Sequence, residues 1–267
     1  MSTPTPSHRM RGLTALVTGA SRGIGRAIAL AYAREGADVV CAATNEALLR
    51  DTVAECTKLD PDGRHSHIVL DVTDRAACFA AVKETERRLG RLDVLMNGAG
   101  VYKGRPFLDY EAGEFQWMFD VNLMGPMHLM QAAIPGMVER GGGSIVNIAS
   151  TASKWSSMNQ SAYNVSKHAL VGLTRCVAQE MAQKKVRVNA ICPGLVDTDM
   201  ISGDWGAAAA AAGKTLEEHL APVLQRVAMR RILRPDEVAA MAVFLASGES
   251  SGMTGQSVSV DAGMLYT

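Results

Sequence analysis

The sequence has no net charge, because 27 lysine and arginine residues balance 27 aspartate and glutamate residues. It also lacks a basic run, so we expect no nucleic-acid partner and no anionic membrane partner. No apolar run approaches the roughly 18 residues that span a membrane. The apolar run after Arg9 and Arg11 is too short for a signal peptide. What remains is a globular chain of 267 residues, 48% hydrophobic, which is enough for a sizeable core.

The sequence also lacks paired cysteines. Its five cysteines stand singly, are odd in number and form no Cys-x-x-Cys motif. They therefore suggest neither a disulfide framework nor a zinc site, and a reduced cytoplasmic setting fits them best. His65 and His67 alternate along an expected strand without a third ligand nearby, so we expect no metal.

Short apolar runs alternate with segments of helical length. This alternation predicts a single α/β domain over residues 12–267, with a mostly parallel sheet covered by helices on both faces. The expected strands are Leu13–Thr18, Asp38–Ala43, Ile68–Leu70, Asp93–Met96, Ser144–Ala149, Arg187–Ile191 and Ser257–Val260. The expected helices cover residues 24–35, 46–59, 74–89, 111–138, 161–183 and 235–247.

Two segments fall outside this alternation. Residues 1–11 are mostly polar and contain Pro4 and Pro6, which predicts a disordered N-terminal tail. Residues 199–233 form the longest segment without a strand and are rich in alanine, glycine and methionine. This second segment could be a lid over a substrate or a surface insertion without a function.

The segment Thr18–Gly25 joins the first strand to the first helix and holds Gly19, Gly23 and Gly25 in the pattern Gly-x3-Gly-x-Gly. Glycines let the backbone turn tightly and approach a pyrophosphate, and a helix N-terminus offers unpaired N–H groups to the anion. Ordinary turns are glycine-rich too, but the strand–turn–helix context favours a dinucleotide site.

The end of the second strand bears on the choice of cofactor. An acidic residue there would bond the ribose 2′-hydroxyl of NAD and repel the 2′-phosphate of NADP. No acidic residue stands there before Glu46. Arg22 can pair with a 2′-phosphate, and Thr44 and Asn45 can donate hydrogen bonds to it. Thr44 or Asn45 can also cap the next helix, so NADP(H) is favoured and NAD(H) is the alternative.

Three more turns follow expected strands. Asp71 could accept a hydrogen bond from an adenine amino group, or Asp71 or Thr73 could cap a helix. The small residues of Asn97–Gly100 would let a cofactor pass close to the backbone, although an ordinary turn is the alternative. The Pro-Gly turn in Pro193–Thr198 lies at the sheet edge where ligands bind in open α/β folds.

Tyr163 and Lys167 lie four residues apart and share one face of the helix expected over residues 161–183. The lysine cation would lower the pKa of the phenol, which normally titrates near ~10. Ser150 could hold a carbonyl oxygen while Tyr163 protonates it. Taken alone, the tyrosine and lysine could equally be a pair on a helix surface.

Asn122 lies within the helix expected over residues 111–138, where asparagine is mildly unfavourable. A specific task, such as a bond to a backbone carbonyl or a water, would explain it, and solvent exposure is the alternative. Pro126, four residues later, predicts a kink in this helix.

Together these motifs resemble the short-chain dehydrogenase/reductase family over about residues 12–263. Gly-x3-Gly-x-Gly is similar to the family's oxidoreductase branch. The local sequences Asn147–Thr151, Tyr163–His168 and Ala190–Gly194 look most like 3-oxoacyl-thioester and polyketide ketoreductases. The resemblance implies a Rossmann-type, doubly wound parallel sheet of seven strands. One departure is Gly98, where the family usually has asparagine, so a side-chain hydrogen bond that ties the central sheet would be absent.

The resemblance also implies roles for individual residues. Tyr163 is the general acid/base, and Lys167 lowers its pKa and bonds the nicotinamide ribose. Ser150 orients the substrate oxygen, and Asn122 supports a proton-relay water. The implied cofactor-binding residues are Gly19, Ser21, Arg22, Gly23, Ile24, Gly25, Thr44, Asn45, Asp71, Val72, Asn97, Ala99, Gly100, Tyr163, Lys167, Pro193, Gly194, Val196 and Thr198. By their position near Ser150 and the Pro-Gly turn, the expected substrate-pocket residues are Trp155, Met158, Asn159, Gln160 and Leu195.

The sequence therefore predicts a cytoplasmic, NADP(H)-dependent oxidoreductase that reduces a ketone, a 3-oxoacyl or related carbonyl substrate, to a secondary alcohol. An NAD-dependent alcohol or sugar dehydrogenase and a dinucleotide-binding protein that has lost catalysis are the alternatives. Helices 111–138 and 161–183 carry more apolar residues than one buried stripe needs. We expect these residues to form a subunit interface or to be buried more deeply, and the resemblance implies a homotetramer.

Overall fold

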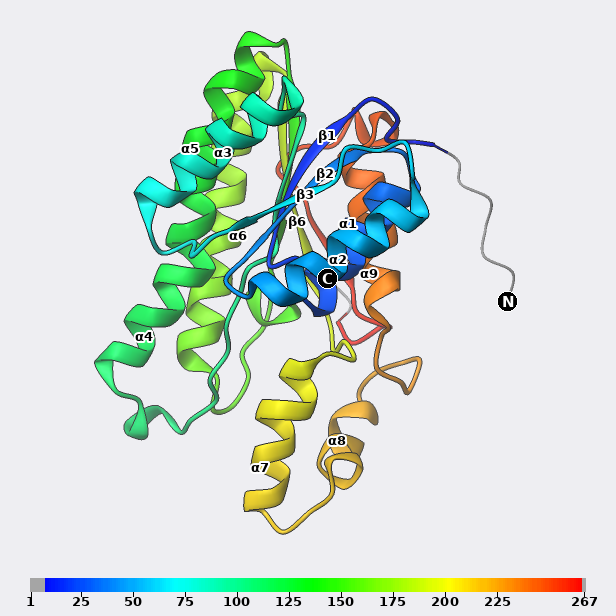
Figure 1. The fold of residues 1–267 in the computed structure, drawn as a ribbon. Helices are drawn as coiled ribbons and strands as arrows, with labels where there is room; N and C mark the ends of the chain where they lie inside the picture. The colour runs from blue at the N-terminus through cyan, green and yellow to red at the C-terminus, as the bar shows by residue number, and fades with distance from the viewer. Residues whose placement is uncertain (1–7, 266–267) are drawn as a thin grey trace.

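The computed structural model describes residues 8–265 (Figure 1). Within this range seven strands form one sheet in the order β3-β2-β1-β4-β5-β6-β7, and each neighbouring pair is parallel. The strands are β1 (Thr14–Thr18), β2 (Asp38–Ala43), β3 (Ser66–Val69), β4 (Val94–Asn97), β5 (Gly143–Ile148), β6 (Val186–Pro193) and β7 (Ser257–Val260). The predicted seven-stranded, doubly wound α/β fold is confirmed.

Helices cover both faces of the sheet (Figure 1). One face carries α1 (Gly23–Arg34), α2 (Glu46–Leu59) and α9 (Pro235–Ala246), and the other carries α3 (Arg75–Leu89), α5 (Gly125–Glu139) and α6 (Ser161–Met181). Successive strand residues point to opposite faces. In β1, Val17 packs into the core beneath α1 and α9, while Leu16 packs into the core beneath α3 and α5. The central strands β1, β4 and β5 are largely apolar because both of their faces are covered.

The strand order places a crevice at the centre of the sheet. The chain moves outward from β1 through β2 to β3, and then returns to pair β4 with the other side of β1. At such a reversal the loops at the carboxyl ends of the two central strands turn in opposite directions and leave room for a ligand. The loops after β1 and β4 both lie here.

The helix predicted over residues 111–138 is interrupted, and this prediction is wrong in that respect. Between α4 (Ala112–Phe119) and α5 the chain makes a π-helical turn over Asp120–Met124. Pro126 lies in the first turn of α5, where its missing N–H group needs no partner. The expected break therefore comes just before Pro126, at a π turn, which is a common place for functional residues.

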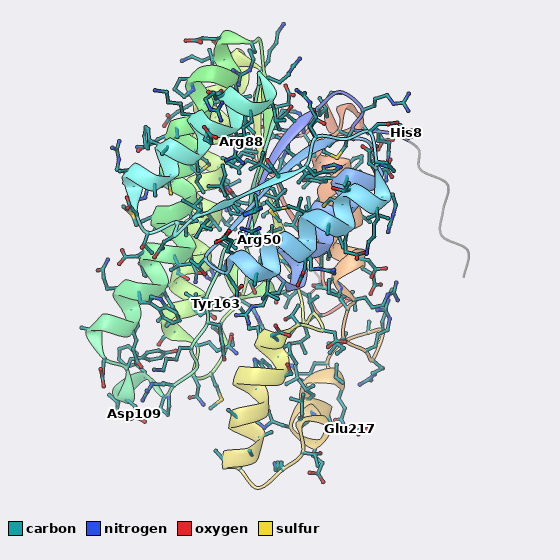
Figure 2. The ribbon with its side chains drawn as sticks, viewed as in Figure 1. His8, Arg50, Arg88, Asp109, Tyr163 and Glu217 are labelled. Carbon is teal, nitrogen blue, oxygen red and sulfur yellow. The ribbon has the colours of Figure 1, made fainter. Side chains whose placement is uncertain are left out.

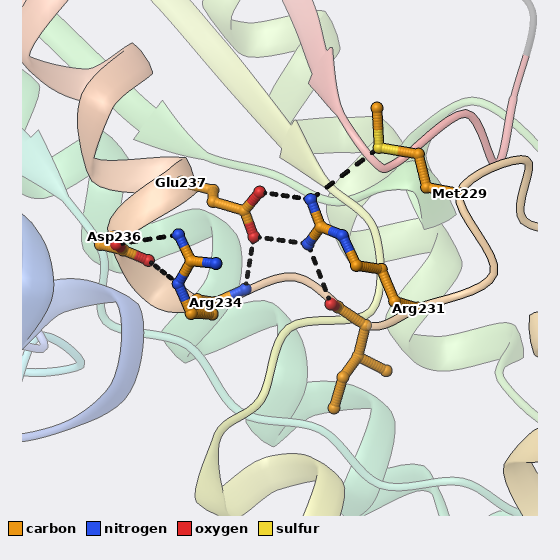
Figure 3. Close-up of polar contacts among 6 residues, drawn as sticks. Met229, Arg231, Arg234, Asp236 and Glu237 are labelled. Atoms are coloured by element: carbon orange, nitrogen blue, oxygen red, sulfur yellow. Dashed lines mark hydrogen bonds and ion pairs between the residues drawn. The ribbon is translucent and has the colours of Figure 1, made fainter. Parts of the chain in front are cut away.

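The segment 199–233 contains two helices, α7 (Gly206–Ala211) and α8 (Leu216–Leu224), which project from the body of the domain (Figure 1). Its far end is anchored at the start of α9, where the guanidinium of Arg231 forms two hydrogen bonds with Glu237 (2.7 and 2.8 Å; Figure 3). The backbone N–H of Arg234 also donates to Glu237 (2.8 Å). Chiefly because of Arg231, the pKa of Glu237 falls to about 2.

The prediction of a disordered tail over residues 1–11 is wrong for residues 8–11, whereas residues 1–7 lie outside the described part. Met10 is fully buried. Arg9 donates to Glu35 from its backbone N–H (3.1 Å) and from its guanidinium (3.0 Å). The ordered domain therefore begins before residue 12.

The described residues contain neither a membrane-spanning helix nor a cluster of metal ligands. No helix in residues 8–265 combines the length and the apolar character that crossing a bilayer requires. In the same part of the chain, no three His, Cys, Asp or Glu side chains gather as metal ligands would. His65 instead accepts a hydrogen bond at Nδ1 from the backbone of Val39 (3.3 Å), and His67 lies 3.5 Å from Glu46.

Candidate active site

A cavity of about 730 Å³ opens at the carboxyl ends of the strands. This volume falls within the usual range for small-molecule and cofactor sites. Its wall combines the glycine-rich loop after β1 with the ends of β2 and β5 and with the turns after β4 and β6. All the predicted cofactor residues line this cavity except Asn45 and Asn97.

The glycine-rich loop fits a dinucleotide phosphate. Gly19 has a φ of +68°, and a Cβ there would lie 2.6 Å from the carbonyl oxygen of Gly98. A Cβ on Gly25 would overlap the carbonyl oxygen of Gly19. Among the described residues no side chain caps the first turn of α1, which begins at Gly23. The N–H groups of this turn are therefore available to an anion in the cavity, as a pyrophosphate requires.

The end of β2 contributes Ala42, Ala43 and Thr44 to the cavity wall, next to Arg22 on the glycine-rich loop. Asn45 caps α2 instead, since its Oδ1 accepts a hydrogen bond from the N–H of Leu48 (3.1 Å). The capping role considered for Asn45 is thus confirmed. Of the three residues expected to meet a 2′-phosphate, Arg22 and Thr44 therefore line the cavity and Asn45 does not.

Asp71 also lines the cavity, and its Oδ1 accepts hydrogen bonds from the N–H (2.9 Å) and the hydroxyl (2.8 Å) of Thr73. Neither of these residues caps α3. That cap is Asp74, whose Oδ1 accepts a hydrogen bond from the N–H of Ala77 (3.0 Å).

Three predicted catalytic side chains line the same cavity: Ser150, Tyr163 and Lys167. Ser150 follows β5, and its Oγ accepts a hydrogen bond from the N–H of Ala152 (3.1 Å). Tyr163 (Figure 2) and Lys167 lie one turn apart on α6. The ammonium of Lys167 donates to the carbonyl of Ile148 (2.9 Å) and lies 5.7 Å from the centre of the Tyr163 ring. The structure thus brings together three groups that lie 17 residues apart or less but belong to two different elements.

Burial sets the direction of both pKa shifts in this group. Desolvation raises the pKa of Tyr163, and its hydrogen bond with Ser150 opposes the rise. Desolvation lowers the pKa of Lys167 to about 8. The net shift of the Tyr163 pKa is therefore upward, because the cost of removing a phenolate from water outweighs the effect of the Ser150 hydrogen bond. That Lys167 lowers the pKa of Tyr163 stays a prediction.

Asn122 is fully buried in the π turn, which rules out the solvent-exposed alternative. Its side-chain amide bonds the backbone of Val101 in both directions, accepting from the N–H (2.9 Å) and donating to the C=O (3.0 Å). It also donates to the hydroxyl of Ser166 (3.1 Å), which in turn donates to the carbonyl of Tyr163 (2.8 Å). Asn122 therefore joins the turn after β4 to the helix that carries the tyrosine.

Gly98 leaves no gap in the central sheet. The hydroxyl of Thr18 accepts hydrogen bonds from the N–H groups of Gly98 (3.0 Å) and Ala99 (3.3 Å) and donates to the carbonyl of Met96 (3.3 Å). A Cβ on Gly98 would lie 2.8 Å from Cε of Met96 and 2.7 Å from the carbonyl oxygen of Thr18. Thr18 thus links β1 to β4 where the usual asparagine is missing, and Met96 fills the space beside the glycine.

The single residues expected in the substrate pocket, Trp155, Met158, Asn159, Gln160 and Leu195, are not in the cavity wall. Met158 is 88% exposed. The carbonyl of Trp155 accepts a hydrogen bond from Asn164 (3.1 Å), and the carbonyl of Leu195 accepts one from Leu233 (2.8 Å). Gln160 precedes α6 and accepts a hydrogen bond from Ser157 (3.0 Å). Their part in binding a substrate stays a prediction, as does that of Asn159.

Tyr102 and Trp117 line the cavity although no motif predicted them. Met200 and Ile201 line it too, and they belong to the segment 199–233, which was expected to be either a lid over a substrate or a surface insertion. The ring of Tyr102 packs edge-on against the ring of Tyr163, with centroids 5.2 Å apart and planes at 82°. Its place two residues beyond Gly100 could have drawn attention to it. Trp117 lies on α4 and has no motif around it, so the sequence offered no signal for it.

A dinucleotide-sized cavity over a helix N-terminus, with a tyrosine, a lysine and a serine in its wall, defines a dinucleotide-dependent oxidoreductase. The family model described as enoyl-(acyl carrier protein) reductase matches residues 19–265. The chain belongs to the short-chain dehydrogenase/reductase family.

Three similar proteins illustrate the range of the family. The chain is 34% identical over 257 residues to 3-oxoacyl-(acyl-carrier-protein) reductase FabG of Thermotoga maritima. This alignment covers 96% of this chain and 99% of that protein. It is 36% identical over 260 residues to 2-keto-3-deoxy-L-fuconate dehydrogenase of Xanthomonas campestris, and the alignment covers 97% of this chain and 82% of that protein. The structure of L-sorbose reductase from Gluconobacter frateurii, complexed with NADPH and L-sorbose, aligns with a TM-score of 0.90 and 30% identity, covering 97% and 98% of the two chains.

Proposed function

We propose that the protein is an NADP(H)-dependent reductase that converts a ketone, a 3-oxoacyl or related carbonyl compound, to a secondary alcohol. The observation that carries the proposal is that Ser150, Tyr163 and Lys167 share one cavity with the glycine-rich loop. NADP(H) is supported by Arg22 in the cavity wall and by the lack of an acidic residue at the end of β2. The NADPH complex of the sorbose reductase agrees with this cofactor, and the name of the FabG relative agrees with the reduction of a 3-oxoacyl substrate.

The bound cofactor would supply the hydride to the carbonyl carbon. Ser150 would hold the carbonyl oxygen by a hydrogen bond, and Tyr163 would transfer its phenolic proton to this oxygen as negative charge develops there. The products are a secondary alcohol and a phenolate on Tyr163. Lys167, whose pKa is about 8, carries a positive charge at neutral pH and would stabilise that phenolate until a proton from solvent restores the phenol. Asn122 fixes the turn and the helix on either side of this pathway.

A second candidate is the oxidation of a sugar or sugar-acid alcohol with NAD. The similarity to 2-keto-3-deoxy-L-fuconate dehydrogenase favours it. The same residues would then work in reverse, with Tyr163 accepting the proton of the alcohol. Titration with each dinucleotide separates the two candidates, since the second requires NAD to bind at least as well as NADP.

We further propose that the chain forms a homotetramer in the cytoplasm. Large apolar side chains are exposed around α4 and on α6: Phe107 (70%), Leu108 (92%), Trp117 (43%) and Val165 (49%). Contacts between copies through α4–α5 and α6 would cover this surface. All five cysteines are free, which supports a reducing compartment. Light scattering on the purified chain tests the assembly, and a monomer at micromolar concentration would contradict it.

The activity can be tested by following NADPH oxidation with acyl thioesters, β-ketoesters, cyclic ketones, aryl ketones and keto-sugars, with NADH in parallel. We expect one of these ketone classes to be reduced with NADPH. Tyr163→Phe should lower turnover by about 10²–10⁴-fold, the usual contribution of a general acid, while NADPH binding is retained. Substantial turnover by Tyr163→Phe would contradict the assignment, and equal use of NADH would contradict the choice of cofactor.

A further inference from the structure

Arg22, the residue proposed to receive the 2′-phosphate, already has an anionic partner. Its Nη1 lies 3.4 Å from Oδ2 of Asp199, and both side chains line the cavity. The two residues are 177 positions apart, so the pair joins the glycine-rich loop to the start of the segment 199–233. No part of the proposed reaction uses Asp199.

Packing places Asp199 beside Arg22 independently of the two flexible side chains. Gly23, next to Arg22, has a φ of +55°, and a Cβ there would lie 3.2 Å from Cγ2 of Thr198. The hydroxyl of Thr198 donates to the carbonyl of Val196 (3.2 Å), and Val196 forms a parallel bridge with Leu233. Thr198, which precedes Asp199, therefore packs its side chain closely against Gly23, which follows Arg22.

We propose that Asp199 is a specificity-determining residue. It is a resident counter-ion on Arg22 that a 2′-phosphate must displace, and it therefore weakens binding of NADP(H) while leaving NAD(H) unaffected. The inference rests on the proposed function, in which Arg22 meets the 2′-phosphate.

The chemistry of the two anions explains the expected direction. A phosphate monoester carries a charge of about −1.5 to −2 and can take two hydrogen bonds from one guanidinium. It therefore competes for Arg22 with the single carboxylate of Asp199. Once displaced, the carboxylate has lost its partner. NAD(H) carries no 2′-phosphate, so the ion pair persists when it binds.

The exposure of the pair limits the size of the effect. Both side chains are 68% exposed. Exposed ion pairs of this kind change equilibria by roughly two- to fivefold and weaken as salt is added. Asp199→Asn should therefore tighten binding of a 2′-phosphate by about two- to fivefold at low salt, and by less at high salt.

Calorimetric titration with adenosine 2′,5′-bisphosphate and with 5′-AMP tests the proposal without any turnover. These nucleotides differ only in the 2′-phosphate. Asp199→Asn should bind the bisphosphate more tightly and 5′-AMP as before. Asp236→Asn is a matched control, because Asp236 pairs with Arg234 at 3.0 Å and these side chains are 65% and 64% exposed, outside the cavity wall. Asp236→Asn should change the affinity for neither nucleotide.

A double-mutant cycle with Arg22→Ala separates displacement from simple repulsion. The gain from Asp199→Asn should vanish when Arg22 is absent. A gain that persists in full would show that Asp199 acts on the phosphate directly, and it would overturn the inference.

Failure of the inference is distinguishable from failure of the proposed function. If the unchanged protein prefers the bisphosphate and Asp199→Asn has the same affinities, the inference is wrong while the choice of NADP(H) stands. If the unchanged protein binds both nucleotides equally, the choice of NADP(H) itself fails.

Discussion

The two walls of the cavity are built in different ways. The cofactor wall, formed by Gly19–Gly25, Ala42–Thr44 and Gly98–Gly100, consists mainly of backbone at the ends of strands. Three of its glycines, Gly19, Gly25 and Gly98, have no room for a Cβ. The opposite wall, which we propose faces the substrate and call the substrate wall, includes Tyr102, Trp117, Met200 and Ile201 from the connections between strands.

This difference explains why the sequence predicts the reaction better than the substrate. The cofactor wall follows from β–α alternation and close packing, which relatives with the same fold share. The substrate wall depends on long connections, which can change without disturbing the sheet. Relatives of similar identity are accordingly named for an acyl-carrier-protein substrate and for a sugar acid. Changes in the cofactor wall should affect all substrates alike, and changes near the substrate wall should be selective.

Gly19→Ala should have the largest effect. The new Cβ would lie 2.6 Å from the carbonyl oxygen of Gly98, at a φ of +68°. One of the two turns must move, and a displacement of about 1 Å can cost 10²-fold in activity. Gly90→Ala is the matched control, since Gly90 has a φ of +83° but no atom within 4 Å of the added Cβ. Fluorescence titration measures the affinity for NADPH, which should be lower in Gly19→Ala than in Gly90→Ala. Equal affinities in the two variants would show that steric contact does not shape the cofactor wall.

Lys167→Met should abolish activity and yet stabilise the protein at pH 7. The fall in pKa from 10.5 to about 8 corresponds to a burial cost of about 3 kcal/mol. The lost hydrogen bond to Ile148 offsets about 1 kcal/mol, which leaves a gain of about 2 kcal/mol. Between pH 8 and 10.5 the unfolded chain keeps the proton that the folded chain has lost, so the unchanged protein gains stability with rising pH.

The stability difference between Lys167→Met and the unchanged protein should therefore shrink from pH 7 to pH 10. Urea denaturation at both pH values measures it. Lys184→Met replaces an exposed lysine and serves as the control, with no gain at either pH. A variant that is less stable at pH 7 would show that the ammonium of Lys167 contributes to folding.

Gly98→Asn should destabilise the turn after β4, which is part of the cofactor wall. The restored side chain would meet Met96 and the carbonyl oxygen of Thr18 at 2.7–2.9 Å, and overpacking of this kind typically costs about 1–3 kcal/mol. Adding Met96→Val should recover part of the loss, since it removes Sδ and Cε from the contact. Thermal unfolding of the two single variants and the double variant measures how strongly the two substitutions depend on each other. Additive changes in stability would contradict the expected steric contact with Met96.

Arg226→Met should have the smallest effect, confined to the substrate side. The guanidinium of Arg226, just beyond α8, lies 4.9 Å from the centre of the Trp155 ring. Such an exposed contact is worth about 0.5–1 kcal/mol, so KM for the ketone should rise by about two- to fivefold while NADPH affinity stays the same. Arg75→Met is the control, because Arg75 stacks on Phe79 at 4.4 Å within α3, outside the segment 199–233. A change in NADPH affinity would contradict the separation of the two walls.

The sequence predicted the parts of the molecule that local patterns determine. Apolar runs bounded by turn residues located β2 and β7 at their observed limits. The π turn around Asn122 was not predicted, because the apolar pattern of residues 111–138 continues through it. Only the structure shows that Val101 and Ser166 satisfy the buried amide of Asn122.

Long-range effects account for the other differences. The spacing of Tyr163 and Lys167 reveals their proximity but not the desolvation that decides their pKa values. Trp155 follows Ser150 closely in sequence, yet its side chain lies beneath Arg226 and not in the cavity wall. Sequence distance from a catalytic residue does not fix the direction in which a side chain points.

All three tryptophans of the chain lie near the substrate side of the site. Trp117 is in the cavity wall, Trp155 lies under Arg226, and Trp205 packs edge-on against His219 in the segment 199–233. The protein thus carries its own optical reporter. Its intrinsic emission arises from the region whose ligand is least defined, so a screen for unknown substrates needs no added dye.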